Sequence, residues 1–291
     1  MNILVTGANG QLGTCIRKMT ARQKAHRYIF TDVASQPGDD TIYLDITNRD
    51  AVRLICESEQ VNLIINCAAY TNVDKAEDDI ALCDLLNHEA PGILAREAAE
   101  RGATLIHIST DYVFGGDVPI PLREDFPAHP TGVYGATKLQ GEKAVQESGC
   151  QYIIIRSAWM YSPYGKNFLK TMRKLTAERP EVKVVFDQVG TPTYAEDLAG
   201  FILHIIGTRQ LNKTGINHYT DEGVCSWYDF ACAIRDLSGT PGKVLPCHTR
   251  EFPSKVVRPA FSVLDKTKAR KTFGITIPHW YESLKKCISE I

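Results

Sequence analysis

The N-terminal part of the chain reads Asn2-Ile-Leu-Val-Thr-Gly7-Ala-Asn-Gly10-Gln-Leu-Gly13, an apolar run that leads into three regularly spaced glycines. This pattern predicts a buried strand, a tight turn and the start of a helix, whose free backbone N–H groups can hold a pyrophosphate. Gly7 permits the turn, Gly10 lets the backbone approach phosphate, and Gly13 lets the helix pack closely on the strand. The stretch predicts a dinucleotide-binding fold, although a glycine triplet alone is often only a turn.

Short β-rich runs alternate with longer amphipathic segments over the first two thirds of the chain. We expect strands at residues 2–6, 28–31, 63–66, 104–108 and 152–156, and helices from Gln11, from about Arg49, over 81–101 and over 134–147. This alternation predicts an α/β fold of the Rossmann type, a doubly wound parallel sheet with helices on both faces. We expect residues 182–186 and a helix over 195–206 to add one more such unit.

Two lobes are expected from the change in pattern after about Leu211. Residues 1–210 are assigned to a dinucleotide-binding domain. Residues 211–291, with shorter elements and a Pro- and Arg-bearing loop, are assigned to a smaller C-terminal α/β substrate lobe. The sequence does not decide whether segment 161–181 belongs to the first domain or to the substrate lobe.

The composition excludes several classes of partner and site. Charge is balanced, with 33 Lys+Arg against 34 Asp+Glu, so we expect neither a nucleic-acid nor a membrane partner. No apolar run approaches the roughly 20 residues that span a bilayer, and no charged leader with an apolar stretch opens the sequence. Nine scattered cysteines without a C-x-x-C pair predict reduced thiols and a cytoplasmic location. With no H-x-x-x-H either, we expect no zinc site.

Asp32 follows the second predicted strand, about 20 residues beyond Gly13, where a carboxylate can accept both hydroxyls of the adenosine ribose. By charge alone it favours NAD(H) over NADP(H), and a surface turn is the alternative role. Asp45 and Ile46 lie where an adenine contact is expected. The residues expected to bind the cofactor are Gly7, Gly10, Gln11, Leu12, Gly13, Asp32, Asp45, Ile46, Ala69, Tyr70, Thr71, Tyr134 and Lys138.

The segment Tyr134-Gly-Ala-Thr-Lys138 places a phenol and an ammonium on one helix face. The ordinary pKa of a phenol is about 10, and we expect the ammonium to lower it toward the working range. Thr110 ends the strand before this helix and is a candidate partner for a substrate carbonyl, because ligands of such folds bind at the carboxyl ends of strands. The alternative is a Tyr/Lys pair on a solvated face.

Tyr112 indicates which reaction the site supports. Sugar-nucleotide dehydratases of this fold need Thr-Asp-Glu, so that the glutamate can remove a carbon-bound proton, whereas this chain reads Thr110-Asp-Tyr112. Carbonyl reduction is therefore favoured, with hydride from nicotinamide, a proton from Tyr134 and stabilisation of the developing alkoxide by Thr110.

Further motifs extend over nearly the whole chain. They are Val73-Asp-Lys-Ala-Glu77, Ser109-Thr-Asp-Tyr-Val-Phe114, Val133-Tyr-Gly-Ala-Thr-Lys138 with Gly141-Glu142, Trp159-Met-Tyr161, Asn167-Phe168, Asp187-Gln188, Gly190-Thr-Pro-Thr193, Trp227-Tyr228 and Arg258-Pro259. With the G-x-x-G-x-x-G turn of extended short-chain dehydrogenase/reductases, this set closely resembles the dTDP-4-dehydrorhamnose reductase family. The resemblance implies NAD(P)H-dependent reduction of the 4-keto group of dTDP-4-dehydro-L-rhamnose, with Tyr134 as proton donor and Lys138 as its partner.

The resemblance also places Thr110 and Asp111 at the substrate and makes Trp159 a wall of the deoxysugar pocket, with core packing as the alternative for Trp159. We expect Asn167 and Arg258 at the substrate as well; Arg258 is suited to clamp a diphosphate bidentately, with an exposed loop arginine as the alternative. Family members generally use NADPH, and some accept NADH. Because of Asp32, we expect a relaxed preference between the two cofactors.

A magnesium ion at a homodimer interface is a further property of some family members, held by glutamates from the first helix, from the segment matching Glu196 and from the C-terminus. Here the first-helix position is Cys15, a poor ligand for a hard cation. We therefore expect no metal. A homodimer is possible, and the sequence does not decide it. The alternative functions are a sugar-nucleotide epimerase or dehydratase, and a non-catalytic nucleotide-binding regulatory subunit.

Overall fold

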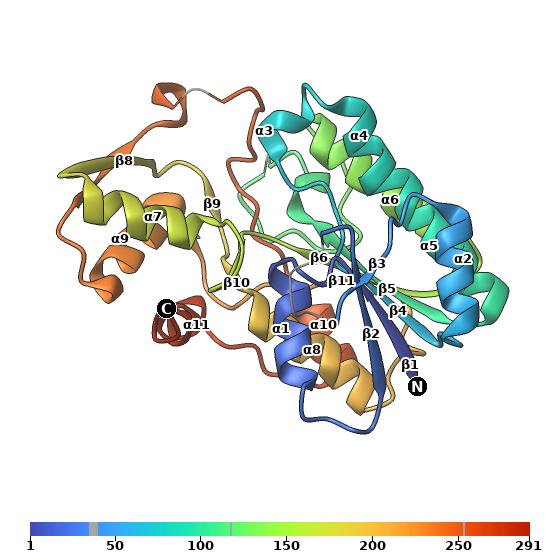
Figure 1. Cartoon of the computed structure of the whole chain (residues 1–291). Coiled ribbons are helices and arrows are strands. Elements are labelled where there is room, and N and C mark those ends of the chain that lie inside the picture. Colours follow the sequence, from blue (N-terminus) through green and yellow to red (C-terminus); the bar gives the residue numbers. More distant parts are fainter. Residues whose placement is uncertain (35–39, 117, 253) are drawn as a thin grey trace.

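A seven-stranded parallel sheet forms the centre of the protein (Figure 1). The computed structural model describes residues 1–34, 40–116, 118–252 and 254–291. The strand order across the sheet is β11 (Gly215–His218), β6 (Gln151–Ser157), β5 (Thr104–Thr110), β4 (Leu63–Asn66), β1 (Asn2–Thr6), β2 (Arg27–Asp32) and β3 (Ile42–Tyr43). Every neighbouring pair is parallel, which confirms the predicted doubly wound α/β fold.

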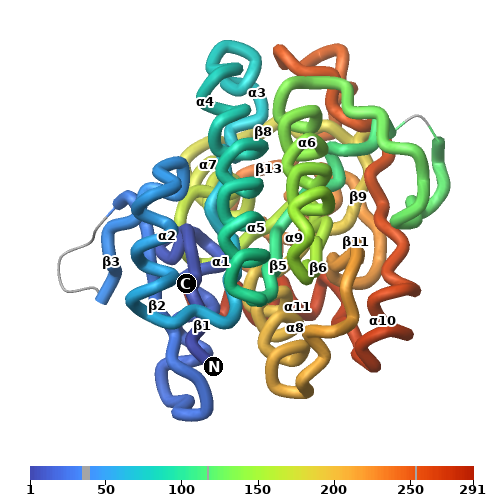
Figure 2. Tube along the Cα trace, turned by 90° about the vertical axis from the view of Figure 1, so that its right-hand side faces the viewer, coloured from blue at the N-terminus to red at the C-terminus, as the bar shows by residue number. Residues whose placement is uncertain are grey.

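Helices cover both faces of this sheet, so its strands read as continuous apolar runs. In β1, Ile3 and Val5 face a cluster with α1 (Gln11–Thr20) and α8 (Ala195–Gly207). Leu4 faces the opposite cluster, with α2 (Arg49–Ser58), α5 (Ala90–Arg101) and α6 (Val133–Glu147). Figure 2 looks onto this second layer, where α2, α5 and α6 lie side by side.

A third hydrophobic cluster lies beside the sheet and forms a second lobe (Figure 1). Its elements are α7 (Phe168–Glu178), β8 (Glu181–Val185), α9 (Trp227–Ser238), β13 (Lys243–Cys247) and α11 (Trp280–Ile288). Two short strand pairs join it to the sheet: β7 (Met160–Tyr161) with β10 (Thr193–Tyr194), and β9 (Val189–Gly190) with β12 (Cys225–Ser226).

The expectation that residues 182–186 add a strand to the central sheet is wrong. Strand β8 pairs in parallel with β13, and the seventh strand of the sheet is β11, beyond residue 211. The reason is visible in β8, where exposed Glu181 and Lys183 alternate with buried Val182 and Val184, as in a strand with one solvated face. We therefore propose that the second lobe is built from residues 159–194, 225–247 and 280–288.

The predicted helix over residues 81–101 is interrupted. It consists of α4 (Ile80–Asp84), the π-helical turn η1 (Leu85–Glu89) and α5. Pro91 has no N–H to donate to the carbonyl of Asn87, which removes one bond of a regular helix at this point. The remaining elements are α3 (Val73–Ala76), α10 (Thr267–Phe273) and the 3-10 turns η2 (Asp111–Val113) and η3 (Thr249–Glu251). Within the described part of the chain, no helix has the length and apolar character needed to cross a membrane.

A buried ion pair joins α6 to the sheet. Glu142 of α6 accepts from Arg156 of β6 through both carboxylate oxygens, at 2.8 Å from Nε and 2.7 Å from Nη2. The two side chains are only 1% and 4% exposed, and Ser109 of β5 also donates to Glu142. Removing one member of such a pair leaves the other charge buried without compensation.

We expect Glu142→Gln to lower the free energy of unfolding by about 3–5 kcal/mol, because Arg156 keeps its charge and loses its counter-ion. Urea unfolding followed by circular dichroism measures the change. The matched control is Glu100→Gln, which breaks an exposed pair with Arg49 and should change stability by about 0.5 kcal/mol or less. Equal losses in the two variants would contradict this account.

Candidate active site

A cleft of about 780 Å³ opens at the carboxyl ends of the central strands, where ligands of open α/β sheets bind. The β1–α1 turn and the ends of β4, β5 and β6 line one side, and residues of the second lobe line the other. The candidate catalytic residues Thr110, Tyr134 and Lys138 all line it. So do the candidate substrate residues Asp111, Trp159, Asn167 and Arg258.

The glycine turn has the geometry of an anion site. Gly7 has φ +62°, and a Cβ there would lie 2.6 Å from the backbone N of Ala68. Gly10 caps α1 without a side-chain bond, so the first N–H groups of the helix are available to a ligand in the cleft. These features fit a dinucleotide pyrophosphate.

Asp32 lines the cleft together with Asp45 and Ile46. Its Oδ2 accepts the backbone N–H of Asn9 at 3.0 Å, and its Oδ1 accepts that of Ala34 at 3.0 Å. Both oxygens therefore already carry backbone donors, which offsets part of the negative charge that favoured NAD(H).

Arg17 lies beside these residues without lining the cleft, and the sequence reasoning did not single it out. Its Nη2 donates to Asn9 at 3.2 Å and to Thr41 at 2.7 Å, and its guanidinium lies 4.4 Å from the centroid of the Phe30 ring. Its position one helical turn beyond Gly13 is the only sequence signal that we recognise. Asn9 thus links the guanidinium to Asp32, because the Asn9 side chain accepts from Arg17 and its backbone N–H donates to Asp32.

Among the other cofactor candidates, Gln11, Leu12, Ala69 and Thr71 line the cleft. Tyr70 does not: its hydroxyl donates to Asp79 at 2.9 Å and its backbone N–H to Asn87, away from the cleft. Gly13 is also absent from the lining, because it packs on the backbone of Ala8, where a Cβ would lie at 2.5 Å. Tyr70 and Gly13 thus have structural contacts in this structure, and their predicted cofactor contacts stay predictions.

Asn167 joins the two sides of the cleft. Its Oδ1 accepts the backbone N–H of Lys170 and caps α7, while its Nδ2 donates to Oε1 of Gln11 at 2.9 Å. Ser162 donates to the same oxygen at 2.8 Å. Asn167 thus fixes the second lobe against the start of α1, and its predicted contact with substrate stays a prediction.

Tyr134 and Lys138 extend from α6 toward the end of β5. Nζ of Lys138 donates to the carbonyl of Ile108 at 2.6 Å. Thr110 donates to Oδ1 of Asp111 at 3.0 Å and accepts the backbone N–H of Tyr112 at 3.2 Å. The cleft therefore gathers a phenol, an ammonium and a hydroxyl around one point at the edge of the sheet.

Burial controls the titration of these groups. It raises the pKa of Tyr134 well above its ordinary value, with Thr110 opposing the shift, and lowers the pKa of Lys138 to about 8. The expectation that Lys138 lowers the pKa of the phenol is not met here, because desolvation dominates and the ammonium bonds Ile108. Burial likewise raises the pKa of Asp111 to about 6. A phenol that stays protonated at neutral pH is in the form that a proton donor requires.

Arg258 is held at the cleft by two partners. Its Nη2 donates to Asp74 at 2.6 Å and its Nη1 to the Tyr112 hydroxyl at 3.3 Å. Tyr112 in turn meets Tyr134 edge to face, with ring centroids 5.5 Å apart. Arg258 therefore has a fixed position from which to meet an anionic group.

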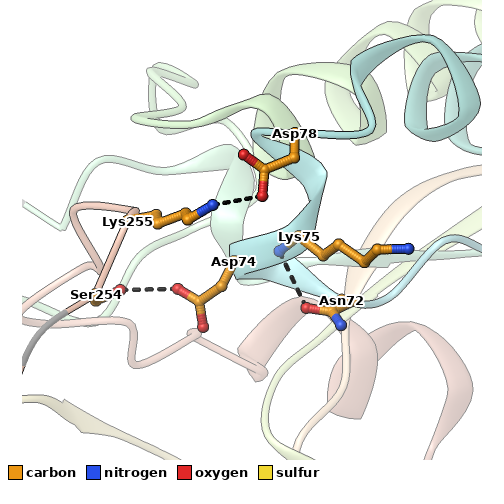
Figure 3. A pocket seen from close by; sticks show the side chains of 6 residues that line it. All are labelled: Asn72, Asp74, Lys75, Asp78, Ser254 and Lys255. Carbon is orange, nitrogen blue, oxygen red and sulfur yellow. Dashed lines mark hydrogen bonds and ion pairs between the residues drawn. The ribbon is translucent and has the colours of Figure 1, made fainter.

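The chain just before Arg258 is tied to α3 around a second, shallower pocket of about 430 Å³ (Figure 3). Ser254 donates to Asp74 at 2.9 Å, and Lys255 pairs with Asp78. These exposed contacts join residues 254–258 to the first domain.

Several lining residues lay outside the sequence prediction. Trp227 comes from the second lobe, and its only sequence signal was the Trp227-Tyr228 motif. The others include Ser157 and Lys166, whereas Tyr112 and Met160 were named in sequence motifs without a site contact assigned to them.

The chain is similar to known proteins over its whole length. The family model described as RmlD substrate binding domain matches residues 1–291. The chain belongs to the RmlD substrate binding domain family. A relative from Burkholderia thailandensis, named dTDP-4-dehydrorhamnose reductase, is 36% identical over 100% of this chain and 99% of its own length.

Solved structures agree with this membership of the RmlD substrate binding domain family. A dTDP-4-dehydrorhamnose reductase from Clostridium acetobutylicum is 44% identical with a TM-score of 0.92, covering 100% of this chain and 99% of that one. The enzyme of that name from Bacillus anthracis, solved in complex with NADP, is 36% identical with a TM-score of 0.91 and the same coverage.

The magnesium site of some members of the RmlD substrate binding domain family does not fit the residues present here. Lys286 donates to Glu196 at 2.6 Å, and the Tyr194 hydroxyl donates to both Glu196 and Glu290. Burial raises the pKa of Cys15 to about 12, so its thiol is neutral. The carboxylates thus already have an ammonium and a hydroxyl as partners.

Across the described ranges no group of three or more His, Cys, Asp or Glu side chains could hold a metal. The homodimer stays a prediction.

We expect Gly7→Ala to weaken NADPH binding by roughly tenfold or more, because the added methyl would push the turn off Ala68 and out of reach of phosphate. Titration of NADPH fluorescence measures the affinity. Gly102→Ala is the matched control, since Gly102 has the same φ of +62° but nothing within 4 Å of a Cβ. This control should lose about 1 kcal/mol of stability and bind NADPH normally. Equal affinity in the two variants would contradict the turn as the phosphate site.

Proposed function

We propose that this chain catalyses the NADPH-dependent reduction of the 4-keto group of dTDP-4-dehydro-L-rhamnose to dTDP-L-rhamnose. The observation that carries the proposal is the convergence of Thr110, Tyr134 and Lys138 on the cleft that the glycine turn opens into. Membership of the family and relatives named dTDP-4-dehydrorhamnose reductase support the substrate.

Each side chain of the cleft has its own role in the proposed reaction. The chemistry supplied by the bound cofactor is hydride transfer to the carbonyl carbon. Thr110 and Tyr134 hold the carbonyl oxygen, and the protonated phenol gives its proton to the alkoxide, which is a far stronger base than a phenolate. Lys138, whose Nζ lies at the end of β5, would hold the nicotinamide ribose of the cofactor. Arg258 meets the diphosphate of the substrate in place of Asp74.

Another 4-keto sugar is the second candidate substrate, because a relative from Streptomyces antibioticus, named probable dTDP-4,6-dihydroxy-2-methyloxan-3-one 4-ketoreductase, is 38% identical over 100% of this chain. Structures of a UDP-glucose 4-epimerase and a dTDP-glucose 4,6-dehydratase are under 20% identical and show the fold alone. Tyr112 argues against the dehydratase reaction, because burial raises its pKa to about 12 and keeps it neutral.

We also propose a cytoplasmic location, because all nine cysteines are free. A nucleotide-linked sugar is the proposed partner molecule, and the balanced charge of the chain gives no reason to expect nucleic acid.

Incubation with dTDP-4-dehydro-L-rhamnose and NADPH tests the proposal, with the product identified by NMR. We expect one NADPH consumed for each dTDP-L-rhamnose formed. An epimerase or a dehydratase would consume no net NADPH, and a regulatory subunit would bind NADPH without turnover. Either result would contradict the proposal.

Tyr134→Phe should lower kcat by roughly 10²- to 10⁴-fold and leave NADPH binding intact, because only the proton donor is lost. Steady-state kinetics and a cofactor titration measure both quantities. Tyr152→Phe, on a strand away from the cleft, is the matched control and should keep wild-type turnover. Unimpaired turnover in Tyr134→Phe would remove the phenol from the mechanism.

Arg17→Gln should lower kcat/KM for NADPH relative to NADH by roughly tenfold, because its guanidinium is linked through Asn9 to Asp32, where we propose that the adenosine ribose and its 2′-phosphate bind. Arg22→Gln, at the exposed end of the same region, is the control and should leave the ratio unchanged. If Arg17→Gln left the ratio at its wild-type value, the cofactor preference would have another origin.

A further inference from the structure

Trp159 has an uncommon backbone conformation for a large side chain. Its φ is +49°, in the left-handed region where bulky residues are rare and persist only when their surroundings hold them. The chain just beyond it is fixed, since Met160 begins β7 and the Trp159 carbonyl accepts the N–H of Thr193 at 3.3 Å. The strain therefore serves to direct the indole into the cleft that it lines.

Trp227 stacks on Trp159. The ring centroids are 3.6 Å apart and the planes are inclined by 11°. Trp227 has a rigid base, because it begins α9 directly after Ser226, whose side chain forms a capping box with Asp229. Phe168 packs against Trp227 in a tilted arrangement, with ring centroids 4.5 Å apart, and so links Trp227 to the core of the second lobe.

Gly190 meets the edge of the same indole. A Cβ at this position would lie 2.8 Å from Cε2 and 2.9 Å from Cζ2 of Trp159, closer than real Cβ atoms come. Gly190 belongs to β9 and pairs with Cys225 of β12, next to the cap of α9. The β9–β12 pair thus supplies the space for the edge of Trp159, and α9, which begins directly after β12, supplies Trp227 for its face.

The indole stands next to the reacting groups. Thr110 and Ser157 are register partners in β5 and β6, and Trp159 follows Ser157 by two residues. Aromatic walls orient ligands in mostly apolar pockets, and orientation at the reacting carbon strongly affects rate. We propose that Trp227 and Gly190 are positioning residues that brace Trp159 against the apolar face of the sugar ring, so that its carbonyl faces Thr110 and Tyr134. The nature of the ligand, a nucleotide-linked keto sugar, rests on the proposed function.

Two variants test the brace from different sides. Gly190→Ala fills the space at the edge of the indole, and Trp227→Leu removes the stack from its face. The control is Gly207→Ala, a helical glycine of α8 with nothing within 4 Å of a Cβ. We expect both test variants to lose the near-ultraviolet circular dichroism of the stacked pair in the ligand-free protein, which is readable because the chain has only three tryptophans.

With dTDP-4-dehydro-L-rhamnose as substrate, both variants should raise KM and lower kcat/KM by roughly 10- to 100-fold, with NADPH affinity unchanged. Gly207→Ala should match the wild type in all three measurements. A dichroism signal that survives in both variants overturns the brace. Lost dichroism with wild-type KM overturns the positioning role while the reductase stands. A wild-type protein that reduces no nucleotide-linked 4-keto sugar overturns the proposed function instead, and the ligand-free dichroism still decides whether the brace exists.

Discussion

The buried pair of Glu142 and Arg156 holds the candidate chemistry together. Glu142 lies on the helix that carries Tyr134 and Lys138, and Arg156 lies on the strand that leads to Trp159. Burying two charges is costly, and the cost is offset only when every donor and acceptor is satisfied. Here the contact is bidentate, Ser109 adds a third bond, and the guanidinium lies over the Phe114 ring. The phenol and the hydroxyl of Thr110 are therefore placed by a rigid support and not by the loops around them.

Much of the fold follows from local pattern. Residues 63–66 were predicted as a strand with the bounds that β4 has, because a short apolar run between turn residues fits a strand buried on both faces. The expectation that β8 joins the central sheet was wrong, because the sheet to which a strand belongs depends on pairing with distant segments, here with β13. Alternation of charge in β8 was a readable signal, whereas nothing in Gly215–His218 marks it as an edge strand of the main sheet. The π-helical turn was missed because a single proline acts within an otherwise helical pattern.

The site shows the same division between local and distant information. Motifs on one turn or one helix placed Gly7, Asp32, Tyr134 and Lys138 at the cleft. The side chains that were missed come from chain segments whose approach requires the fold, as Trp227 does. The pKa of the phenol was harder to predict than its position. A lysine one helical turn from a tyrosine predicts a lowered phenol pKa in water, whereas burial of Tyr134 raises its pKa. The prediction of no magnesium rests on Cys15, because a thiol is the wrong donor for a hard cation, and it stays a prediction.

The way the chain passes between the two lobes has a mechanical consequence. It leaves the sheet after β6, returns for α8 and β11, and leaves again, and β7 with β10 and β9 with β12 tie these passages into strand pairs. Hinge rotation needs a few residues that absorb the whole change in backbone angles, and several hydrogen-bonded crossings cannot supply them together. The connection between the second lobe and the central sheet is therefore stiff. Residues 254–258, by contrast, are held to the first domain by ion pairs with Asp74 and Asp78, and because these pairs are partly exposed to solvent, rising ionic strength weakens them.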